Sequence, residues 1–155
     1  MDKLQIKIRK ASKEDVPDIV RIISDNPIGA LREDFQENIP NSYYVAFDRI
    51  DQDINQLLVV AEIKSNIVGT LQISFISNMS VKGAYRALIE GMHVDSKYRG
   101  EGVGTFMMEW AINKARQKGC NIAQLTSNKE RIDAHRFYSR LGFVATHEGF
   151  KLALT

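Results

Sequence analysis

Three glycines at alternate positions form the stretch of the chain best suited to bind a phosphate. Gly100, Gly102 and Gly104 begin one residue after Arg99. Glycine lets the backbone approach a ligand closely and adopts positive φ without a steric penalty. A helix beginning at Gly102 or Val103 would leave its first amides without intrahelical partners, and these amides and the helix dipole attract phosphate. The turn therefore predicts a pyrophosphate site; a plain strand-to-helix turn is the alternative.

Two other phosphate-binding loops do not match this turn. The dinucleotide fingerprint needs a third glycine where Thr105 stands and an acidic residue at the end of the next strand. The strand expected next, Ile122–Thr126, contains no acid. A P-loop needs Gly-Lys followed by Ser or Thr, which the chain lacks.

A second block lies at residues 133–143, with the sequence Asp-Ala-His-Arg-Phe-Tyr-Ser-Arg-Leu-Gly-Phe. Residues 99–104 resemble the Arg/Gln-x-x-Gly-x-Gly/Ala motif of the GCN5-related N-acetyltransferase (GNAT) family, and the second block is similar to that family's Ala-x-x-Phe-Tyr-x-x-x-Gly-Phe segment. The order and spacing of the two blocks also match, over roughly residues 85–145. Within the family, Thr126-Ser127-Asn128 followed by Arg131 is most similar to the aminoalkylphosphonate acetyltransferases.

The resemblance implies an acetyl-CoA-dependent enzyme that transfers an acetyl group directly to a primary amine of a small molecule. Two alternatives remain open: acetylation of a protein N-terminus or lysine, and a non-catalytic module that only binds acyl-CoA. The implied fold is α/β (α+β), a single domain over residues 1–155. Its mixed, mostly antiparallel twisted sheet would have six or seven strands, flanked by about four helices. Two neighbouring strands, Ala84–Val94 and Ile122–Thr126, would splay apart to admit the pantetheine arm.

The resemblance also assigns the cofactor to the glycine turn, the preceding strand end and the short helix beyond. The backbone amides near Met92 to Val94 would stabilise the oxyanion of the tetrahedral intermediate. Asn128 would bond the pantetheine amides, with a turn cap as its alternative role. The expected cofactor-binding residues are Met92, His93, Val94, Arg99, Gly100, Gly102, Val103, Gly104, Thr105, Asn128 and Phe137.

Acyl transfer to an amine needs a base and an acid. An alkyl amine with a pKa near 10.4 arrives protonated at neutral pH, and a departing thiolate with a pKa near 8.5 benefits from a proton donor. Tyr138 is the expected acid. Glu90 is the expected base, since a carboxylate in a half-dry cleft would have a raised pKa. His93 and His135 are alternatives, and Gly91 stands where many relatives carry a second acid.

Composition limits the other classes of function. The net charge is +2 and the basic residues are scattered, so a nucleic-acid-binding surface is not expected. No apolar run approaches a membrane-spanning length, and no histidine or cysteine spacing indicates a metal site. Cys120 is the single cysteine, which fits a reducing cytoplasm. A homodimer is compatible with these data.

Hydrophobic periodicity predicts the elements that position these residues. Alternation predicts a strand containing Leu4, Ile6 and Ile8, and a capping box between Ser12 and Asp15 precedes a helix with Val16, Ile19, Val20 and Ile23. Further helices are expected over Leu31–Glu37 and from Ser42, with Tyr43, Phe47, Ile50 and Ile54 on one face. A hairpin is expected over Leu57–Lys64 and Ile67–Ile76, with Asn66 at positive φ in its turn.

The C-terminal half completes the expectation. Gly91 inside its strand indicates a bulge or a close backbone approach. A helix over Val103–Gln117 would bury Val103, Phe106, Met107, Trp110, Ala111 and Ala115 and end at Gly119. A short helix would place Ala134, Phe137, Tyr138 and Leu141 on one face and end at Gly142. Two closing strands are expected at Phe143–Thr146 and Phe150–Leu154.

Overall fold

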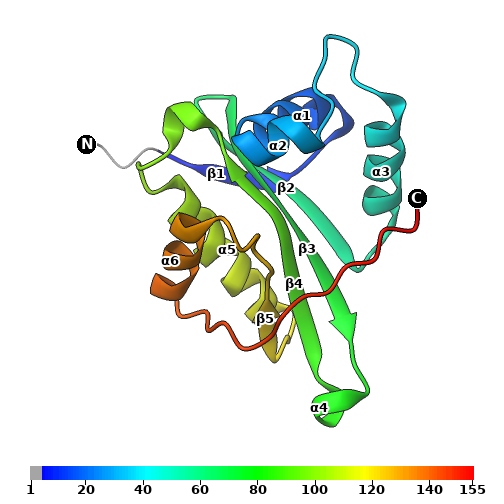
Figure 1. The fold of residues 1–155 in the computed structure, drawn as a ribbon, viewed down its shortest axis with the longest axis vertical. Coiled ribbons are helices and arrows are strands. Elements are labelled where there is room, and N and C mark those ends of the chain that lie inside the picture. Colours follow the sequence, from blue (N-terminus) through cyan, green and yellow to red (C-terminus); the bar gives the residue numbers. More distant parts are fainter. Residues whose placement is uncertain (1–4) are drawn as a thin grey trace.

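A twisted five-stranded sheet forms the centre of the fold. The computed structural model describes residues 5–155, so Leu4 of the first predicted strand lies outside the described residues. The strands, in the order β1-β2-β3-β4-β5, are β1 Lys7–Lys10, β2 Gln56–Ile63, β3 Asn66–Ser77, β4 Tyr85–Val94 and β5 Ile122–Gln124. The first four pair antiparallel and β5 pairs parallel with β4 (Figure 1). The mixed, mostly antiparallel sheet is confirmed, but six or seven strands was too many.

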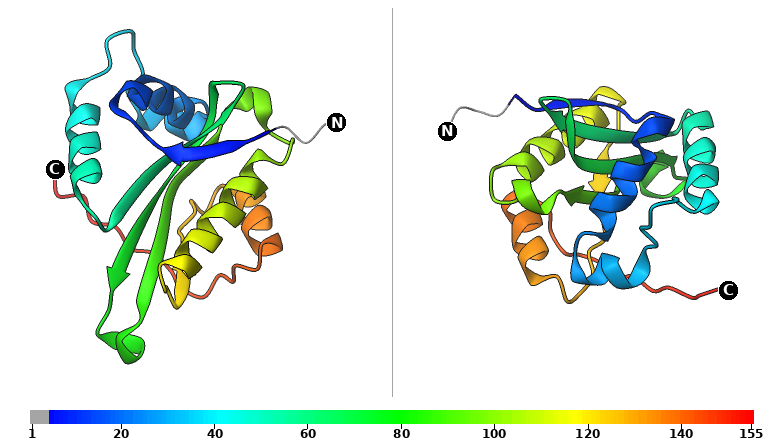
Figure 2. Two further views of the ribbon diagram at one scale, coloured as in Figure 1. Left: turned by 180° about the vertical axis from the view of Figure 1, so that it is seen from behind. Right: turned by 90° about the horizontal axis from the view of Figure 1, so that it is seen from above.

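Six helices accompany the sheet within residues 5–155. They are α1 Val16–Ser24, α2 Pro27–Arg32, α3 Asn41–Gln52, the short α4 Ser80–Gly83, α5 Val103–Gln117 and α6 Ile132–Arg140. Helices α5 and α6 lie on one side of the molecule and α1, α2 and α3 on the other (Figures 1 and 2). None of the helices in this range is long and apolar enough to cross a membrane.

Two apolar clusters cover the two faces of the sheet. The larger joins α5 to β2, β3 and β4, with Leu71, Ile73 and Met107 fully buried. The smaller packs α1 and α3 against the opposite face of β2. Helix α5 buries Met108 in place of the expected Phe106, which is 42% exposed, and Trp110 is half-buried. The buried face of α5 is therefore rotated toward residues 107, 108 and 111.

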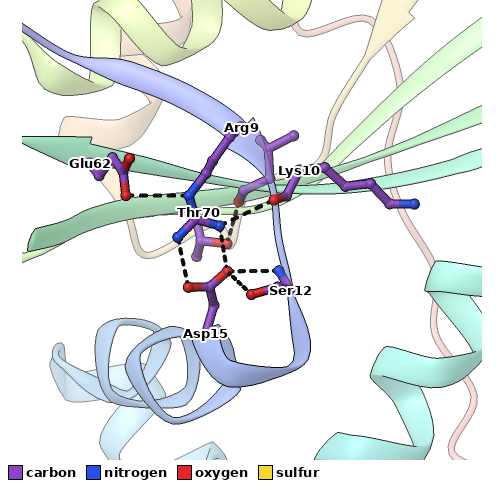
Figure 3. Close-up of polar contacts among 7 residues, drawn as sticks. Arg9, Lys10, Ser12, Asp15, Glu62 and Thr70 are labelled. Carbon is purple, nitrogen blue, oxygen red and sulfur yellow. Dashed lines mark hydrogen bonds and ion pairs between the residues drawn. The ribbon is translucent and has the colours of Figure 1, made fainter. Parts of the chain in front are cut away.

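An ion-pair network joins the first strand to the first helix (Figure 3). The guanidinium of Arg9 donates to both carboxylate oxygens of Asp15 at 2.7 and 2.9 Å, and its Nε donates to Glu62 on β2 at 3.3 Å. The backbone N–H of Ser12 donates to the same Asp15 carboxylate at 2.7 Å, as the predicted capping box requires. The hydrogen bond from Arg9 lowers the pKa of Asp15, against the opposing effect of burial.

The segment between α1 and β3 departs from expectation in its details. Helix α2 lies over Pro27–Arg32 rather than 31–37, because the side chain of Asn26 accepts from the N–H of Gly29 at 2.8 Å and caps it early. Helix α3 begins at Asn41, so Ser42 does not cap it. In the hairpin turn, positive φ occurs at Lys64 and Ser65, and residue 66 already belongs to β3.

Both closing strands predicted after α6 are wrong. Helix α6 ends at Arg140, Gly142 two residues later has φ +98°, and the N–H of Phe143 donates back to the carbonyl of Tyr138 at 3.1 Å. Residues 144–155 then continue without any helix or strand, and Phe150 is 92% exposed. Alternating apolar residues favour a strand, but a strand also needs a partner, and this segment has none within residues 5–155. For the same reason β5 stops at Gln124, two residues short of its predicted end.

Candidate active site

A bulge interrupts β4 at the predicted glycine. In the ladder between β3 and β4, Thr70 pairs with His93 and Gln72 pairs with Glu90. Two residues of β4, Gly91 and Met92, therefore lie opposite the single β3 residue between these pairs. Gly91 has φ +60°, in the left-handed region that glycine tolerates. The predicted bulge is confirmed. Since residues paired across an antiparallel ladder project to the same face, the bulge puts Glu90 and His93 on one face despite their spacing of three.

The neighbouring strands β4 and β5 separate just before this bulge, as expected. Strand β5 pairs with β4 only at residues 86–88, opposite residues 122–124. From Ile89 to Val94, the edge of β4 that faces β5 has no strand partner within residues 5–155. Backbone groups around Met92 therefore border an opening in the sheet. An extended ligand can hydrogen-bond there as a further strand would.

The glycine turn lies at the end of this opening. Gly100 has φ +79° and Gly102 has φ +86°, and a Cβ built on either would meet no atom within 4 Å. The first hydrogen bond of α5 runs from the N–H of Phe106 to the carbonyl of Gly102 at 3.1 Å. None of the six amides from Gly100 to Thr105 donates to an acceptor within residues 5–155. These donors, at the positive end of a 15-residue helix, can hold a phosphate.

Gly104 lets three elements meet behind the turn. A Cβ at this position would lie 3.2 Å from Cε of Met92, 3.5 Å from Cζ of Phe137 and 3.8 Å from Cγ2 of Val94. The side chain of Val103 is buried in the core, so only its amide faces the turn. Helix α5, the end of β4 and helix α6 therefore approach one another closely here, which brings several predicted cofactor residues together.

The side chain of Arg99 donates hydrogen bonds to two backbone carbonyls. Its Nε donates to the carbonyl of Val94 at 3.1 Å and one terminal nitrogen donates to the carbonyl of Asp25 at 2.6 Å. The Asp25 carboxylate in turn accepts from the N–H of Ser96 at 3.1 Å. The end of α1 is thus joined to the turn through Arg99 and Asp25.

A buried carboxylate, that of Asp95, stabilises the segment that leads into the glycine turn. Asp95 is 5% exposed, accepts from the N–H of Lys97 at 3.0 Å and pairs with Arg21 of α1 at 2.8 Å. Burial alone would raise the pKa of Asp95, but these two bonds outweigh burial and lower it. Sequence analysis missed Arg21, Asp25 and Asp95 as positioning residues. Asp95 two residues before Lys97 has the spacing of an Asx turn, but partners 71 and 74 residues away leave no local signal.

Tyr138 occupies an aromatic setting on α6. Its ring lies edge-on to Phe137 at 5.3 Å and to Phe143 at 6.1 Å between centroids. Burial raises the pKa of Tyr138, against the positive charge of Arg131. The phenol therefore keeps its proton at neutral pH. Its hydroxyl donates no hydrogen bond within residues 5–155, which leaves the proton for a ligand.

The three candidate bases differ in their surroundings. Glu90 is exposed and makes no hydrogen bond or ion pair within residues 5–155, so the half-dry cleft expected around it is absent. His93 is 8% exposed; burial, then the positive charges of Arg131 and Arg32, lower its pKa to about 4. It is therefore neutral at pH 7 and a weak base. His135 is half-buried, and its Nε2 donates to the carbonyl of Asn128 at 2.8 Å.

The side-chain oxygen of Asn128 caps a turn, which is the alternative role expected for this residue. The Oδ1 atom accepts from the N–H of Glu130 at 2.9 Å and caps a turn. Next to it, the buried Oγ of Ser127 lacks any partner within residues 5–155. An unpaired buried hydroxyl is costly. Ser127 is therefore a further group that a ligand can satisfy. The described residues hold no group of three metal-ligating side chains.

Arg131 influences both sides of the site electrostatically. Its positive charge acts to lower the pKa of His93 on β4 and of Tyr138 on α6. No hydrogen bond or ion pair within residues 5–155 joins Glu90 to Tyr138. The structure thus brings the start of α5, the end of β4 and Phe137 together, and leaves Glu90 exposed on the face of β4 that also carries His93.

Comparison with known proteins decides the family. The model of the acetyltransferase (GNAT) family matches residues 25–143. The chain belongs to the GNAT family. Among curated GNAT relatives, the aminoalkylphosphonate N-acetyltransferase of Salmonella typhimurium is 43% identical over 56 residues, 36% of this chain and 36% of that protein. Human N-alpha-acetyltransferase 30 is 29% identical over 147 residues, 95% of this chain and 37% of that protein. The chain thus spans just over a third of the length of these two relatives.

A solved structure resembles this GNAT chain along nearly all of its length. The crystal structure of a transcriptional regulator from Bacillus halodurans is 41% identical, with a TM-score of 0.94, and the alignment covers 97% of this chain and all of that one. About five of the 155 residues are therefore unmatched, fewer than the twelve that follow Phe143. The similarity accordingly extends into the segment after α6.

Proposed function

We propose that this GNAT domain transfers an acetyl group from acetyl-CoA directly to a primary amine of a small molecule. One observation carries the proposal: the unpaired edge of β4 from Ile89 to Val94 leads to six free amides at the N-terminus of α5. Pantetheine is an extended chain with two amides, and it ends in a diphosphate. A strand edge followed by an anion-binding turn offers complementary groups to both parts.

The proposed chemistry is a direct attack. The neutral amine nitrogen bonds to the thioester carbonyl carbon, and amides near Met92 stabilise the oxyanion. When the C–S bond breaks, the sulfur takes a proton from the hydroxyl of Tyr138, which its raised pKa keeps available. Glu90 removes the amine proton through water, because its exposed carboxylate reaches solvent. His93, with a pKa of about 4, is the poorer base.

The charge around His93 supports an acceptor that carries an acidic group. Arg131, Arg32 and Arg99 all lower the pKa of His93 through their charge, and only Glu33 acts in the opposite direction. An aminoalkylphosphonate, the acceptor named for the Salmonella relative, would place its anion among these cations. The human relative is named an N-alpha-acetyltransferase, so an alpha-amine such as a peptide N-terminus is the second candidate.

An amine panel tests this proposal. CoA release is measured with aminoalkylphosphonates, with matched amino alcohols that lack the phosphonate, and with short peptides bearing free N-termini. We expect turnover of the phosphonates and a lower kcat/KM for the alcohols. Replacing Arg131 with Gln should reduce that preference through KM. Faster turnover of peptides would favour the second candidate, and acetyl-CoA binding without turnover of any amine would leave a non-catalytic acyl-CoA-binding module.

Two further parts of the proposal concern the setting of the enzyme. We place it in the cytoplasm, because Cys120 is its single cysteine and a half-buried free thiol persists in a reducing compartment. We also propose that it acts as a homodimer.

A further inference from the structure

Helices α1 and α3, which lie on the same side of the sheet (Figures 1 and 2), leave an apolar pocket between them. Its volume is about 120 Å³. Apolar side chains of both helices form its walls and residues of β2 and β3 form its floor; they include Ile19, Val20, Phe47, Ile50 and Leu58. An apolar cavity of about 150 Å³ holds benzene, so this pocket suits a compact hydrocarbon group of about four or five carbons.

The floor of this pocket continues toward the candidate base. Leu58 of β2 pairs with Gln72 of β3, and Gln72 pairs with Glu90 of β4, so the three residues form one row across the sheet. Residues paired in this way project to the same face, and neighbouring strands lie about 4.8 Å apart. Leu58 and Gln72 both line the pocket. Glu90 therefore lies one strand beyond the pocket, on the same face.

Two polar side chains line the pocket, and one of them keeps a free acceptor atom. The hydroxyl of Tyr43 accepts from the N–H of Asp34 at 2.8 Å and donates to Glu33 at 3.1 Å. Gln72 donates from Nε2 to Gln56 at 2.8 Å, while its Oε1 accepts no hydrogen bond within residues 5–155. An amine at the pocket mouth can donate to this oxygen while its hydrocarbon part contacts the walls.

We propose that this pocket binds the apolar substituent of the acceptor, so that the preferred substrate is a primary amine bearing a compact branched hydrocarbon group. The proposal rests on the acetyl transfer proposed above and narrows its substrate class. With the hydrocarbon group between α1 and α3, the amine lies between Gln72 and Glu90. A phosphonate on the same carbon stays outside the pocket, because none of the lining residues is an arginine or a lysine.

Two amines that differ only in the hydrocarbon group test the pocket: aminomethylphosphonate and 1-amino-3-methylbutylphosphonate. Full burial of one CH₂ group favours binding about fourfold, so the four added carbons set an upper limit of about 200-fold. Ala46 on the wall of the pocket is exposed, so burial of the substituent is incomplete. We expect the wild type to prefer the larger amine by at least about tenfold in kcat/KM.

A filled pocket should lose this preference. Ala46→Leu adds three carbons to the wall, and because Ala46 is exposed the longer side chain needs no rearrangement of the core. Val45→Leu is the matched control, since Val45 is 41% exposed on the same helix and does not line the pocket. We expect Ala46→Leu to lower the preference at least about fivefold, through KM for the larger amine, and Val45→Leu to keep it. Equal kcat/KM for the two amines in the wild type, or an unchanged preference in Ala46→Leu, would overturn the proposal.

A binding measurement separates this proposal from the proposed function. Methyl NMR signals of Ile19, Ala46 and Ile50 are recorded with 3-methylbutylamine and with methylamine, in the absence of acetyl-CoA. The larger amine should shift these signals, methylamine should not, and Ala46→Leu should abolish the shifts of Ile19 and Ile50. Such shifts in a chain that turns over no amine would support the pocket and refute acetyl transfer. Unshifted signals in a chain that acetylates amines would overturn the pocket and leave acetyl transfer standing.

Discussion

Replacing His93 with Gln should remove a pH dependence from the free energy of unfolding. Burial and the nearby arginines hold the pKa of His93 at about 4, against 6.5 for the free side chain. Between these values the unfolded chain binds a proton that the folded chain does not, so stability falls as the pH falls through this window. Each pKa unit is worth about 1.36 kcal/mol, which sets the loss from pH 7 to pH 4 at roughly 3 kcal/mol or less.

Urea unfolding followed by the fluorescence of Trp110 measures this effect. The lowered pKa values of Asp15, Asp25, Asp53 and Asp95 cost stability mainly below about pH 5, so the histidine contribution is read between pH 6.5 and about 5. His147→Gln is the matched control, since this side chain is exposed in the segment after α6. The control should keep the wild-type slope between pH 6.5 and about 5. A His93→Gln variant with that same slope would refute the assignment.

Three further outcomes are expected at the site. Gly102→Val, which forces a branched side chain to φ +86°, should weaken acetyl-CoA binding in calorimetry; equal affinity would place the cofactor elsewhere. Tyr138→Phe should lower kcat by about 10²-fold and leave acetyl-CoA affinity nearly unchanged, and an unaltered kcat would exclude the phenol as the acid. Glu90→Gln should depress kcat/KM at neutral pH, with a loss that shrinks as the pH approaches the pKa of the amine; a loss confined to KM that weakens with salt would indicate attraction of a cationic substrate instead.

Local signals predicted the parts of the site that depend on local geometry. The glycines at 91, 100 and 102 all adopt positive φ, as the position of Gly91 inside a strand and of the other two in a strand-to-helix turn indicates. The supporting contacts could not be found this way. The bonds from Arg21 to Asp95 and from Ser96 to Asp25 join residues more than 70 positions apart, and nothing in either sequence neighbourhood specifies the partner.

The prediction of two C-terminal strands was wrong for a related reason. Alternation at residues 150, 152 and 154 correctly describes an extended chain with one apolar face, but pairing depends on what lies next to it. The exposure of Glu90 is similar: the sequence places it on the strand, while the surroundings that set its burial come from elements far along the chain. The prediction for helix α5 was closer: its bounds are correct, and a small rotation puts Met108 instead of Phe106 in the core.

The extra residue in β4 has a consequence for insertions and deletions. Removing one residue from the middle of a strand normally inverts the facing of everything beyond it. Here Gly91 is itself the surplus residue, so its deletion would leave Glu90, Met92 and His93 on the faces they now occupy. The shortened strand would gain a regular ladder and lose the exposed amides at the opening. We expect this deletion of one residue to keep or raise the melting temperature while abolishing the thermal shift caused by acetyl-CoA, so that the extra residue in β4 serves binding rather than folding.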